Sequence, residues 1–429
     1  MPIGSATPEE RVILVGLDLK SRGRNQTTGV VSFSADESME ELRTLAVSAG
    51  AGVEGTILQS RAAPDAATLI GSGKLRELSD QVRFHEADTV LFDSELTPTQ
   101  QRNLEKALDC KVIDRTQLIL DIFARRARTR EGQLQVELAQ LNYLLPRLTG
   151  HGAAMSRLGG GIGTRGPGET KLETDRRRIH NRIRKLEGDL EGVRAGRGIQ
   201  RKQRQSVPLA TIALVGYTNA GKSTLFNRLT HAGVLADAKM FATLDPTVRH
   251  ISLPSKRRVL MSDTVGFIRN LPTTLVKAFR ATLEEVTEAS LLLHVVDASS
   301  PHAEQHMAEV MHVLHEIGAA EKTQILVRNK ADLLPDGMES LGTSPAQVVA
   351  VSARTGEGVG TLLEAIDRSL SLDPISRVRL RIPATEGALI HRVHEQGRVG
   401  SIHYTDDACE MEADVPESLL RRLQPFIAA

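Results

Sequence analysis

The sequence has few of the residues that mark secreted, membrane-spanning or disulfide-rich proteins. Cysteine occurs twice in 429 residues, as Cys110 and Cys409, and neither lies in a CxxC pair. Two cysteines so far apart in the sequence do not indicate a disulfide framework or a zinc site. No apolar run approaches the roughly 20 residues needed to cross a bilayer. The basic segment and long apolar core of a signal peptide are also missing at the N-terminus. We therefore expect a cytoplasmic protein without stable membrane insertion.

Tryptophan is absent and aromatic residues make up only 3% of the chain, whereas the charges are unevenly spread. The formal net charge is +1, yet Lys and Arg gather in 125–130 and 157–206. In 157–206, 14 Lys and Arg residues stand against 6 Asp and Glu residues. Such a run usually forms the solvent-exposed face of a helix. On its own it therefore indicates a nucleic-acid-binding surface no more strongly than an ordinary charged surface.

Residues 1–120 are predicted to form an N-terminal α/β domain, because strand-like apolar runs alternate with helix-like segments. The strand-like runs lie at 11–17, 56–59, 89–92 and 111–114, and the helix-like segments at 38–48, 75–84 and 98–108. This order is typical of a parallel sheet. The run from Ile70 to Lys74 resembles a phosphate loop but lacks the first glycine at the required spacing. We expect a turn before a helix there.

Residues 121–205 are predicted to form a stalk of two antiparallel helices. Apolar residues recur at intervals of three, four and seven within 119–148, and again on one face of 169–194. A glycine-rich tip at 151–168 joins the two helices, and 195–207 has the composition of a polar linker. The tip contains G-x-G-x-x-G. We do not interpret it as a dinucleotide fingerprint, because no strand precedes it and no βαβ unit encloses it.

Basic side chains crowd this stalk. They are Arg157 and Arg165 on the tip, and Arg176, Arg177, Arg178, Arg182, Arg184 and Lys185 on the second helix. A basic stalk with a thin glycine loop suits insertion among RNA phosphates. Because the region has almost no aromatic residues, we expect phosphate and shape contacts rather than base stacking.

The most informative stretch in the chain reads G-Y-T-N-A-G-K-S and fits G-x-x-x-x-G-K-[ST], the loop whose backbone N–H groups cradle nucleotide phosphates. A strand-like run at 211–215 enters it and a helix-like run at 223–229 leaves it. This order places the phosphates at a helix N-terminus. The expected nucleotide contacts come from Gly216, Tyr217, Thr218, Asn219, Ala220, Gly221, Lys222, Ser223 and Thr224.

Further motifs predict a magnesium-dependent P-loop GTPase domain over 206–372, with a doubly wound, mostly parallel sheet. Ser223, Thr243 and Asp263 would hold Mg²⁺, with Thr247 as the alternative to Thr243. The Gly266 N–H of the motif 263–266 would contact the γ-phosphate, since only glycine allows that close approach. We expect Lys222, Thr243 and Gly266 to be the catalytic residues. Hydrolysis would then release the loop that carries Thr243 and the loop 263–266.

Guanine selection is predicted from Asn329-Lys330-Ala331-Asp332 and Ser352-Ala353-Arg354, which both follow strand-like runs. The Asp332 carboxylate can accept from N1–H and the exocyclic amine of guanine, a pair that adenine does not offer. Lys330 would pack along the base, Asn329 would tie loops together, and the Ala353 N–H would bond the guanine O6. Four motifs in series at strand ends favour GTP over ATP as substrate.

Phe267 follows the DxxG motif where many GTPases place a glutamine that orients the attacking water. Phenylalanine cannot orient water by a side-chain hydrogen bond, so unaided hydrolysis should be slow and need another group or a partner. Asn219 could seat a K⁺ ion beside the phosphates and so supply positive charge. An asparagine that only stabilises the loop is the equal alternative.

Residues 373–429 are predicted to form a small α+β C-terminal domain. Strand-like runs at 377–382, 400–404 and 409–413 surround an amphipathic segment at 387–394. Nothing in these residues indicates a particular function.

Several runs together resemble the HflX family of GTPases. They are 134–141 (LQVELAQL), 145–148 (LPRL), 159–170 (GGGIGTRGPGET), 216–223 (GYTNAGKS) and 263–268 (DTVGFI). Lys171 departs from the family pattern, which usually has glutamine after GET. The resemblance implies a ribosome-associated GTPase that binds the large subunit and its ribosomal RNA, works slowly alone and is stimulated by the ribosome. It implies that the glycine-rich tip approaches the peptidyl-transferase region and that stalled or hibernating ribosomes are split or rescued under stress.

Two other functions fit the same motifs. A large-subunit assembly or RNA-maturation GTPase would bind precursor particles instead of mature subunits. A regulatory GTP switch acting on a protein partner would not depend on the basic residues Arg176, Arg177 and Arg178. In each case we expect a monomer.

Overall fold

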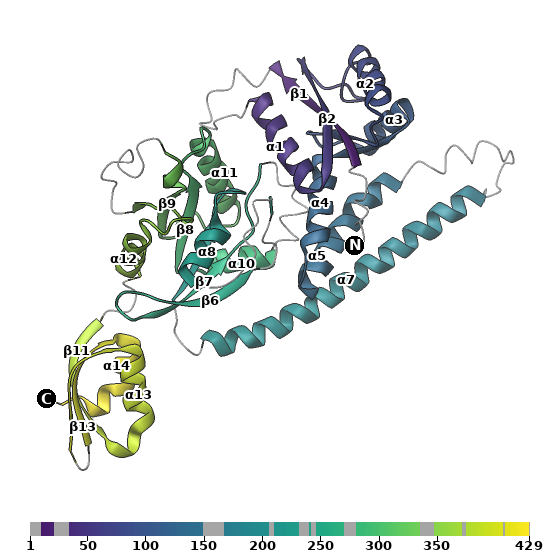
Figure 1. Ribbon diagram of the computed structural model, residues 1–429. Helices are drawn as coiled ribbons and strands as arrows, with labels where there is room; N and C mark the ends of the chain where they lie inside the picture. Colours follow the sequence, from purple (N-terminus) through teal and green to yellow (C-terminus); the bar gives the residue numbers. More distant parts are fainter. Residues whose placement is uncertain are drawn as a thin grey trace, which may run out of the picture. The chain divides into compact units, whose positions relative to one another are not determined.

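The computed structural model describes residues 10–20, 34–148, 167–205, 210–230, 240–241, 246–269, 280–334, 347–370, 375–405 and 408–428 (Figure 1). The chain divides into two compact units. One comprises 1–196, 237–245 and 268–281, and the other comprises 197–236, 246–267 and 282–429. In the described parts of the chain, no helix is both long enough and apolar enough to cross a membrane.

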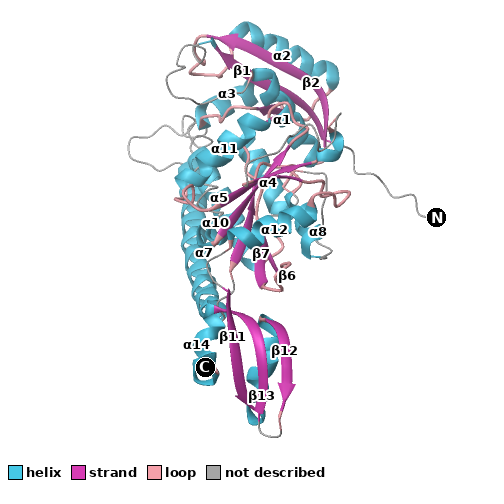
Figure 2. Ribbon diagram, turned by 90° about the vertical axis from the view of Figure 1, so that its left-hand side faces the viewer, coloured by secondary structure: helices cyan, strands magenta, loops and turns pink. Residues whose placement is uncertain are grey.

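A four-stranded parallel sheet forms the centre of the first unit. Its strands are β1 (Glu10–Leu19), β2 (Ala51–Arg61), β3 (Thr89–Phe92) and β4 (Lys111–Asp114), in the order β2-β1-β3-β4. Helices α1 (Ala35–Ser48), α2 (Ser72–His85) and α3 (Pro98–Leu108) connect them. Ile13 of β1 packs with Leu78 of α2 and Leu104 of α3, while α1 lies on the opposite face (Figure 1, Figure 2). The predicted parallel α/β domain is confirmed.

Local sequence signals fix where these helices begin. Ser34 and Thr97 are N-cap residues whose side chains accept from the backbone of Glu37 and Gln100, and the side chains of Glu37 and Gln100 bond back to the caps. These capping boxes satisfy N–H groups that the first helical turn leaves without partners. Gly71 is the N-cap of α2, so the run from Ile70 is the turn before a helix that its sequence predicted.

The single helix expected over 119–148 is wrong, because the chain is interrupted there. Helix α4 (Arg115–Arg126) ends at Ala127, whose backbone is extended. Helix α5 (Arg130–Leu144) begins after Thr129, whose hydroxyl accepts from the Gly132 N–H at 3.0 Å, and the 3-10 turn η3 (Leu145–Leu148) follows it. A threonine side chain that bonds the backbone competes with helix continuation. The apolar periodicity of the sequence continues through this break, so the sequence pattern does not indicate where α4 ends and α5 begins.

Helix α5 packs antiparallel to α7 (Pro167–Gln205), as expected (Figure 1). Leu134 packs with Leu186 and Leu190, and the Arg182 guanidinium donates to both carboxylate oxygens of Glu137, at 2.6 and 2.7 Å. The linker predicted at 195–207 is wrong over most of its length, because α7 continues to Gln205. Lys, Arg and Gln are good helix formers, and here they outweigh the glycines at 196 and 198.

The second unit contains a six-stranded sheet in the order β10-β9-β8-β5-β7-β6. Its strands are β5 (Thr211–Val215), β6 (Thr247–Ser252), β7 (Arg258–Asp263), β8 (Leu291–Asp297), β9 (Gln324–Asn329) and β10 (Val348–Ala350), and the helices are α8 (Lys222–Thr230), α10 (Arg280–Glu288), α11 (Ala303–Glu316) and α12 (Val359–Ser369). Every neighbouring pair is parallel except β6 and β7. The predicted doubly wound, mostly parallel sheet is confirmed.

The C-terminal residues form a three-stranded antiparallel sheet with two helices. Strands β11 (Ile375–Pro383), β12 (Arg398–Tyr404) and β13 (Ala408–Pro416) lie in the order β11-β13-β12, and the helices are α13 (Gly387–Gln396) and α14 (Glu417–Leu423). Their buried core joins Leu380, Met411 and Leu423. This arrangement confirms the predicted small α+β domain.

Candidate nucleotide-binding site

The candidate phosphate loop connects the end of β5 to the start of α8. A Cβ atom added to Gly216 would lie 2.2 Å from the carbonyl oxygen of Val295. At Gly221, where φ is +89°, an added Cβ would lie 2.2 Å from Nδ2 of Asn329. Any other residue at either position would collide with its neighbour, and at Gly221 it would also strain the backbone. Both glycines therefore let the loop lie close against β8 and β9.

Lys222 is buried beneath this loop. Its ammonium group donates to the carbonyl oxygens of Gly216 at 3.0 Å and Tyr217 at 2.8 Å. Burial lowers the pKa of Lys222 to about 8, and the nearby Asp263 carboxylate opposes that shift. Phosphate oxygens bound in the loop would favour the charged ammonium further. The lysine is thus placed to neutralise a polyphosphate.

Ser223 and Asp263 meet where magnesium is expected. The Ser223 hydroxyl donates to Oδ2 of the buried Asp263 at 2.7 Å. A hydroxyl and a carboxylate are the hard oxygen ligands that Mg²⁺ uses, and the ion keeps waters and phosphate oxygens for its other positions. No group of three or more His, Cys, Asp or Glu side chains in the described residues could hold a metal by itself. The donor set therefore fits an ion that binds together with a nucleotide.

Thr243 and Thr247 are the two candidates for a further magnesium ligand. Thr243 lies outside the described residues. Thr247 is the first residue of β6 and is paired in register with Asp263 of β7. The alternative ligand is therefore a neighbour, in the sheet, of the carboxylate that is expected to bind the metal.

The DxxG loop lies directly against the phosphate loop. The Thr218 N–H donates to the carbonyl oxygen of Phe267 at 2.8 Å, and the Phe267 N–H donates to that of Gly216 at 3.1 Å. A Cβ added to Gly266 would lie 2.9 Å from Cα of Thr218 and 3.1 Å from Nζ of Lys222. The Phe267 side chain is buried. It contributes packing and backbone hydrogen bonds, and no polar side-chain group.

Asn329, at the end of β9, joins three segments of the site. Its side-chain N–H donates to the carbonyl oxygen of Ala220 at 2.8 Å, and its side-chain oxygen accepts from the Ala353 N–H at 3.0 Å. Asn329 is 1% exposed. One buried side chain therefore holds the phosphate loop beside the loop that follows β10. The Ala353 N–H, which the sequence suggested for the guanine O6, is bonded to Asn329 here.

Asp332 is exposed next to this junction, where a base could reach it. The Ser352 hydroxyl donates to Oδ1 of Asp332 at 2.7 Å, and the Lys330 ammonium contacts Oδ2 of Asp297 at 2.6 Å. Sequence reasoning missed Asp297. It ends the apolar run of β8, and a carboxylate at the carboxyl end of a parallel strand could have signalled it.

The other predicted contact residues occupy different surroundings. Tyr217 and Thr218 are buried in the loop, Asn219 is exposed with a φ of +60°, and Thr224 is half-buried in the first turn of α8. Arg354 is exposed, and its carbonyl oxygen accepts from the Arg228 guanidinium. All of these except Arg354 belong to the phosphate loop or its helix.

His294 lies in the middle of β8 and is 4% exposed. Among the described residues, its Nε2 atom has no hydrogen-bond partner. Burial and the nearby charge of Lys222 lower the pKa of His294 to about 4. The imidazole is therefore neutral at pH 7 and packs beneath the phosphate loop, in keeping with a packing role rather than a ligand role.

The basic face of the stalk is exposed on α7. Arg176, Arg177, Arg184, His180 and Asn181 line a shallow open hollow. Arg178 is largely exposed and pairs weakly with Asp175 at 3.7 Å, whereas Arg182 is engaged by Glu137. Arg157 and Arg165 of the tip lie outside the described residues. The described part of the stalk thus offers several cations to solvent along one helix.

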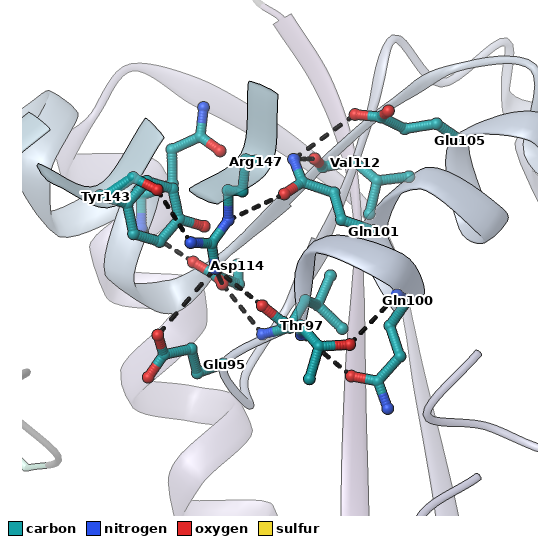
Figure 3. A network of polar contacts seen from close by, with 11 residues as sticks. Glu95, Thr97, Gln100, Gln101, Glu105, Val112, Asp114, Tyr143 and Arg147 are labelled. Carbon is teal, nitrogen blue, oxygen red and sulfur yellow. Dashed lines mark hydrogen bonds and ion pairs between the residues drawn. The ribbon is translucent and has the colours of Figure 1, made fainter. Parts of the chain in front are cut away.

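The run 145–148 has a structural role at the end of α5 (Figure 3). Arg147 donates from Nη2 to the carbonyl oxygen of Leu96 at 2.7 Å and from Nε to Oε1 of Gln101 at 3.1 Å. Its Nη2 also lies 3.4 Å from Oδ2 of Asp114. Leu96 and Gln101 lie beside the carboxyl end of β3 and on α3. Arg147 therefore ties the helical stalk to the parallel sheet of the same unit.

Three family models match consecutive parts of the chain. They are described as the GTP-binding GTPase N-terminal region (residues 36–124), the GTP-binding GTPase middle region (126–204) and the 50S ribosome-binding GTPase (211–330). The third contains the phosphate loop and ends within the motif at 329–332.

Proteins called GTPase HflX are similar over nearly the whole chain. The one from Caldanaerobacter subterraneus is 46% identical over 98% of this chain and 95% of its own length. The one from Escherichia coli is 46% identical over 85% of this chain and 87% of its own length. A crystal structure of a GTP-binding protein from Sulfolobus solfataricus in complex with GDP is 24% identical, with a TM-score of 0.42 over 84% of this chain and 99% of that one.

Proposed function

Because this chain belongs to the HflX family of GTPases, we propose that it is a GTP-driven switch that binds the large ribosomal subunit and splits or rescues stalled or hibernating ribosomes under stress. The observation that carries the nucleotide part is the junction at Asn329, which holds the phosphate loop beside the exposed Asp332. The ribosomal part is supported by the match of residues 211–330 to a family described as 50S ribosome-binding GTPases.

Hydrolysis would proceed by attack of water on the γ-phosphate of bound GTP. Lys222 would bind the β- and γ-phosphates, and the Gly266 N–H would bond the γ-phosphate as negative charge develops there. Magnesium, when bound, would neutralise part of this charge, and Ser223, Thr243 and Asp263 would hold it. Asn219 would place K⁺ at the same phosphates.

Slow unaided turnover is the consequence of Phe267. Its side chain is buried and has no polar group, so it does not orient the attacking water. The site would reach its full rate of hydrolysis only on a partner that supplies or orders a group to orient the attacking water. We assign this role to the ribosome. The exposed cations of α7 would hold ribosomal RNA through phosphate contacts.

Sedimentation of ribosomes with the full-length protein tests this proposal. With a non-hydrolysable GTP analogue, we expect the protein to sediment with the 50S subunit and to convert 70S particles into subunits. With GDP, we expect little of either. GTP hydrolysis measured in parallel should rise when 50S subunits are added.

A charge-matched pair of variants tests the role of the stalk. Replacing Arg176, Arg177 and Arg178 with Gln should weaken ribosome binding and its stimulation of hydrolysis, while GDP affinity stays unchanged. Replacing Arg76, Arg83 and Arg102, which are exposed on α2 and α3, removes the same charge and should have a much smaller effect. Unchanged ribosome binding in the first variant would favour a switch that acts on a protein partner. Binding to precursor particles alone would favour an assembly role.

A further inference from the structure

The phosphate loop is held by two separate sets of contacts. One set acts on its first half, residues 216–218, and the other on its second half, residues 219–223. The second half is fixed by Asn329, which bonds the Ala220 carbonyl oxygen and lies against Gly221. The first half is fixed by the backbone of Phe267, which bonds Gly216 and Thr218 on either side of Tyr217. The two halves therefore have different anchors: the backbone of the DxxG loop bonds the first half, whereas the second half meets that loop through the Ser223 hydroxyl and Asp263.

A third contact holds the first half. The ring of Tyr217 is stacked on the imidazole of His306, with centroids 4.1 Å apart and the planes at 16°. Tyr217 is 5% exposed. His306 lies in the first turns of α11 and also meets His302 edge to face, with centroids 6.4 Å apart. Aromatic stacking of this geometry adds stability beyond the burial of surface.

The stacked residue also contacts the loop lysine. The carbonyl oxygen of Tyr217 accepts from Nζ of Lys222 at 2.8 Å and from the Ala220 N–H at 3.3 Å. If the Tyr217 ring shifts, its carbonyl oxygen and the adjoining Gly216 and Thr218 bonds to Phe267 shift with it. Gly266, whose N–H is assigned to the γ-phosphate, is the neighbour of Phe267. The stack thus acts on the part of the site that distinguishes GTP from GDP.

From this geometry we propose that His306 is a positioning residue for GTP hydrolysis. Its imidazole holds Tyr217, and through Tyr217 it keeps the first half of the phosphate loop in register with the DxxG loop. The proposal rests on the GTPase activity proposed above and adds a residue that lies on α11, outside every nucleotide motif. It explains why the second position of this loop carries a large aromatic side chain.

Three variants of the full-length protein test it. His306→Ala removes the ring, His306→Phe keeps a flat ring of similar size, and His312→Ala removes an exposed imidazole from the same helix. For His306→Ala, we expect kcat for GTP hydrolysis and affinity for a non-hydrolysable GTP analogue each to fall about threefold to tenfold. Affinity for GDP should change by less than about twofold, because Asn329 and α8 hold the second half of the loop.

The rescue variant separates stacking from other roles of the imidazole. His306→Phe should restore most of the kcat and of the GTP-analogue affinity, and His312→Ala should match the wild type. Equal losses of GDP and GTP-analogue affinity in His306→Ala would show a merely structural role and overturn the proposal. Failure of His306→Phe to restore activity would also overturn it, since a polar contact would then be responsible. If the wild-type protein bound no GDP, the proposed GTPase function itself would fail.

Discussion

Arg147 and Asp114 face each other at 3.4 Å, although Arg147 lies in the turn η3 after α5 and Asp114 ends the strand β4. The Arg147 guanidinium also lies 3.5 Å from the centre of the Tyr143 ring (Figure 3). Asp114 is 1% exposed and accepts from the N–H groups of Leu96 and Gln117. A buried carboxylate of this kind needs both its hydrogen bonds and a nearby cation.

Replacement of Arg147 should therefore destabilise the first unit. We expect Arg147→Ala to cost about 3 kcal/mol, because it removes the cation beside Asp114 and leaves the Leu96 carbonyl oxygen without this donor. Arg147→Lys should recover only part of the loss, since an ammonium does not reach Leu96, Gln101 and Asp114 at once. Hydrogen exchange of the Leu96 and Gln117 amides would measure the effect locally.

The matched control for this change is Arg178→Ala. Its side chain is 77% exposed and its ion pair with Asp175 is long, so the stability should change by less than about 0.5 kcal/mol. If both variants were equally stable, the network around Asp114 would have no role in joining the stalk to the sheet.

The pH dependence of stability should report on His294. Its pKa is about 4 in the folded protein, against an ordinary histidine value of 6.5, so between these values the unfolded chain binds more protons. Stability should therefore fall as the pH drops from 6.5 towards 4, and His294 should account for about 3 kcal/mol of the total loss. In His294→Leu this part of the slope should vanish.

Denaturant unfolding of the nucleotide-free protein at pH 7, 6, 5 and 4.5 would measure this slope by circular dichroism. His312→Leu is the control, because His312 is exposed on α11. Its profile should follow the wild type. A His294→Leu profile as steep as that of the wild type would mean that other groups cause the acid sensitivity.

The sequence predicts the strand ends of the nucleotide domain well and the helical stalk less well. Apolar runs that end at Asp263 or Asn329, or just before Gly216, identify each loop, because the motifs expected for phosphate, metal and base binding place these residue types there. The break before α5 was missed, because a cap at Thr129 is a local hydrogen bond that leaves the apolar period intact. Asp297 and His306 were missed for another reason. Both make contacts that only the folded chain creates, Asp297 of β8 with Lys330 and His306 of α11 with Tyr217.

Base specificity should depend on Asp332. In Asp332→Asn, the side-chain oxygen can still accept from Ser352 and from the guanine N1–H, but the amide N–H now faces the exocyclic amine, which is also a donor. We expect GTP affinity to fall at least about a hundredfold, since one hydrogen bond is lost and the other no longer involves a charged group. Xanthosine triphosphate, whose base carries an oxygen in place of the amine, should bind better than GTP. Calorimetric titration of the variant with each nucleotide separately would measure both affinities, and an unchanged GTP affinity would sink the assignment.

The monovalent cation should decide how fast this protein hydrolyses GTP without a partner. Asn219 lies at the exposed turn of the phosphate loop with a φ of +60°, where its side chain is accessible to an ion beside the phosphates. We expect faster hydrolysis in KCl than in NaCl at equal ionic strength, because the larger ion would place positive charge where the γ-phosphate develops charge.

Asn219→Ala should abolish the difference between the salts while GDP affinity changes little. Asn219→Gly, which suits a positive φ, controls for backbone strain and should also lose the K⁺ effect. Equal rates of the wild type in the two salts would leave Asn219 as a residue that only stabilises the loop.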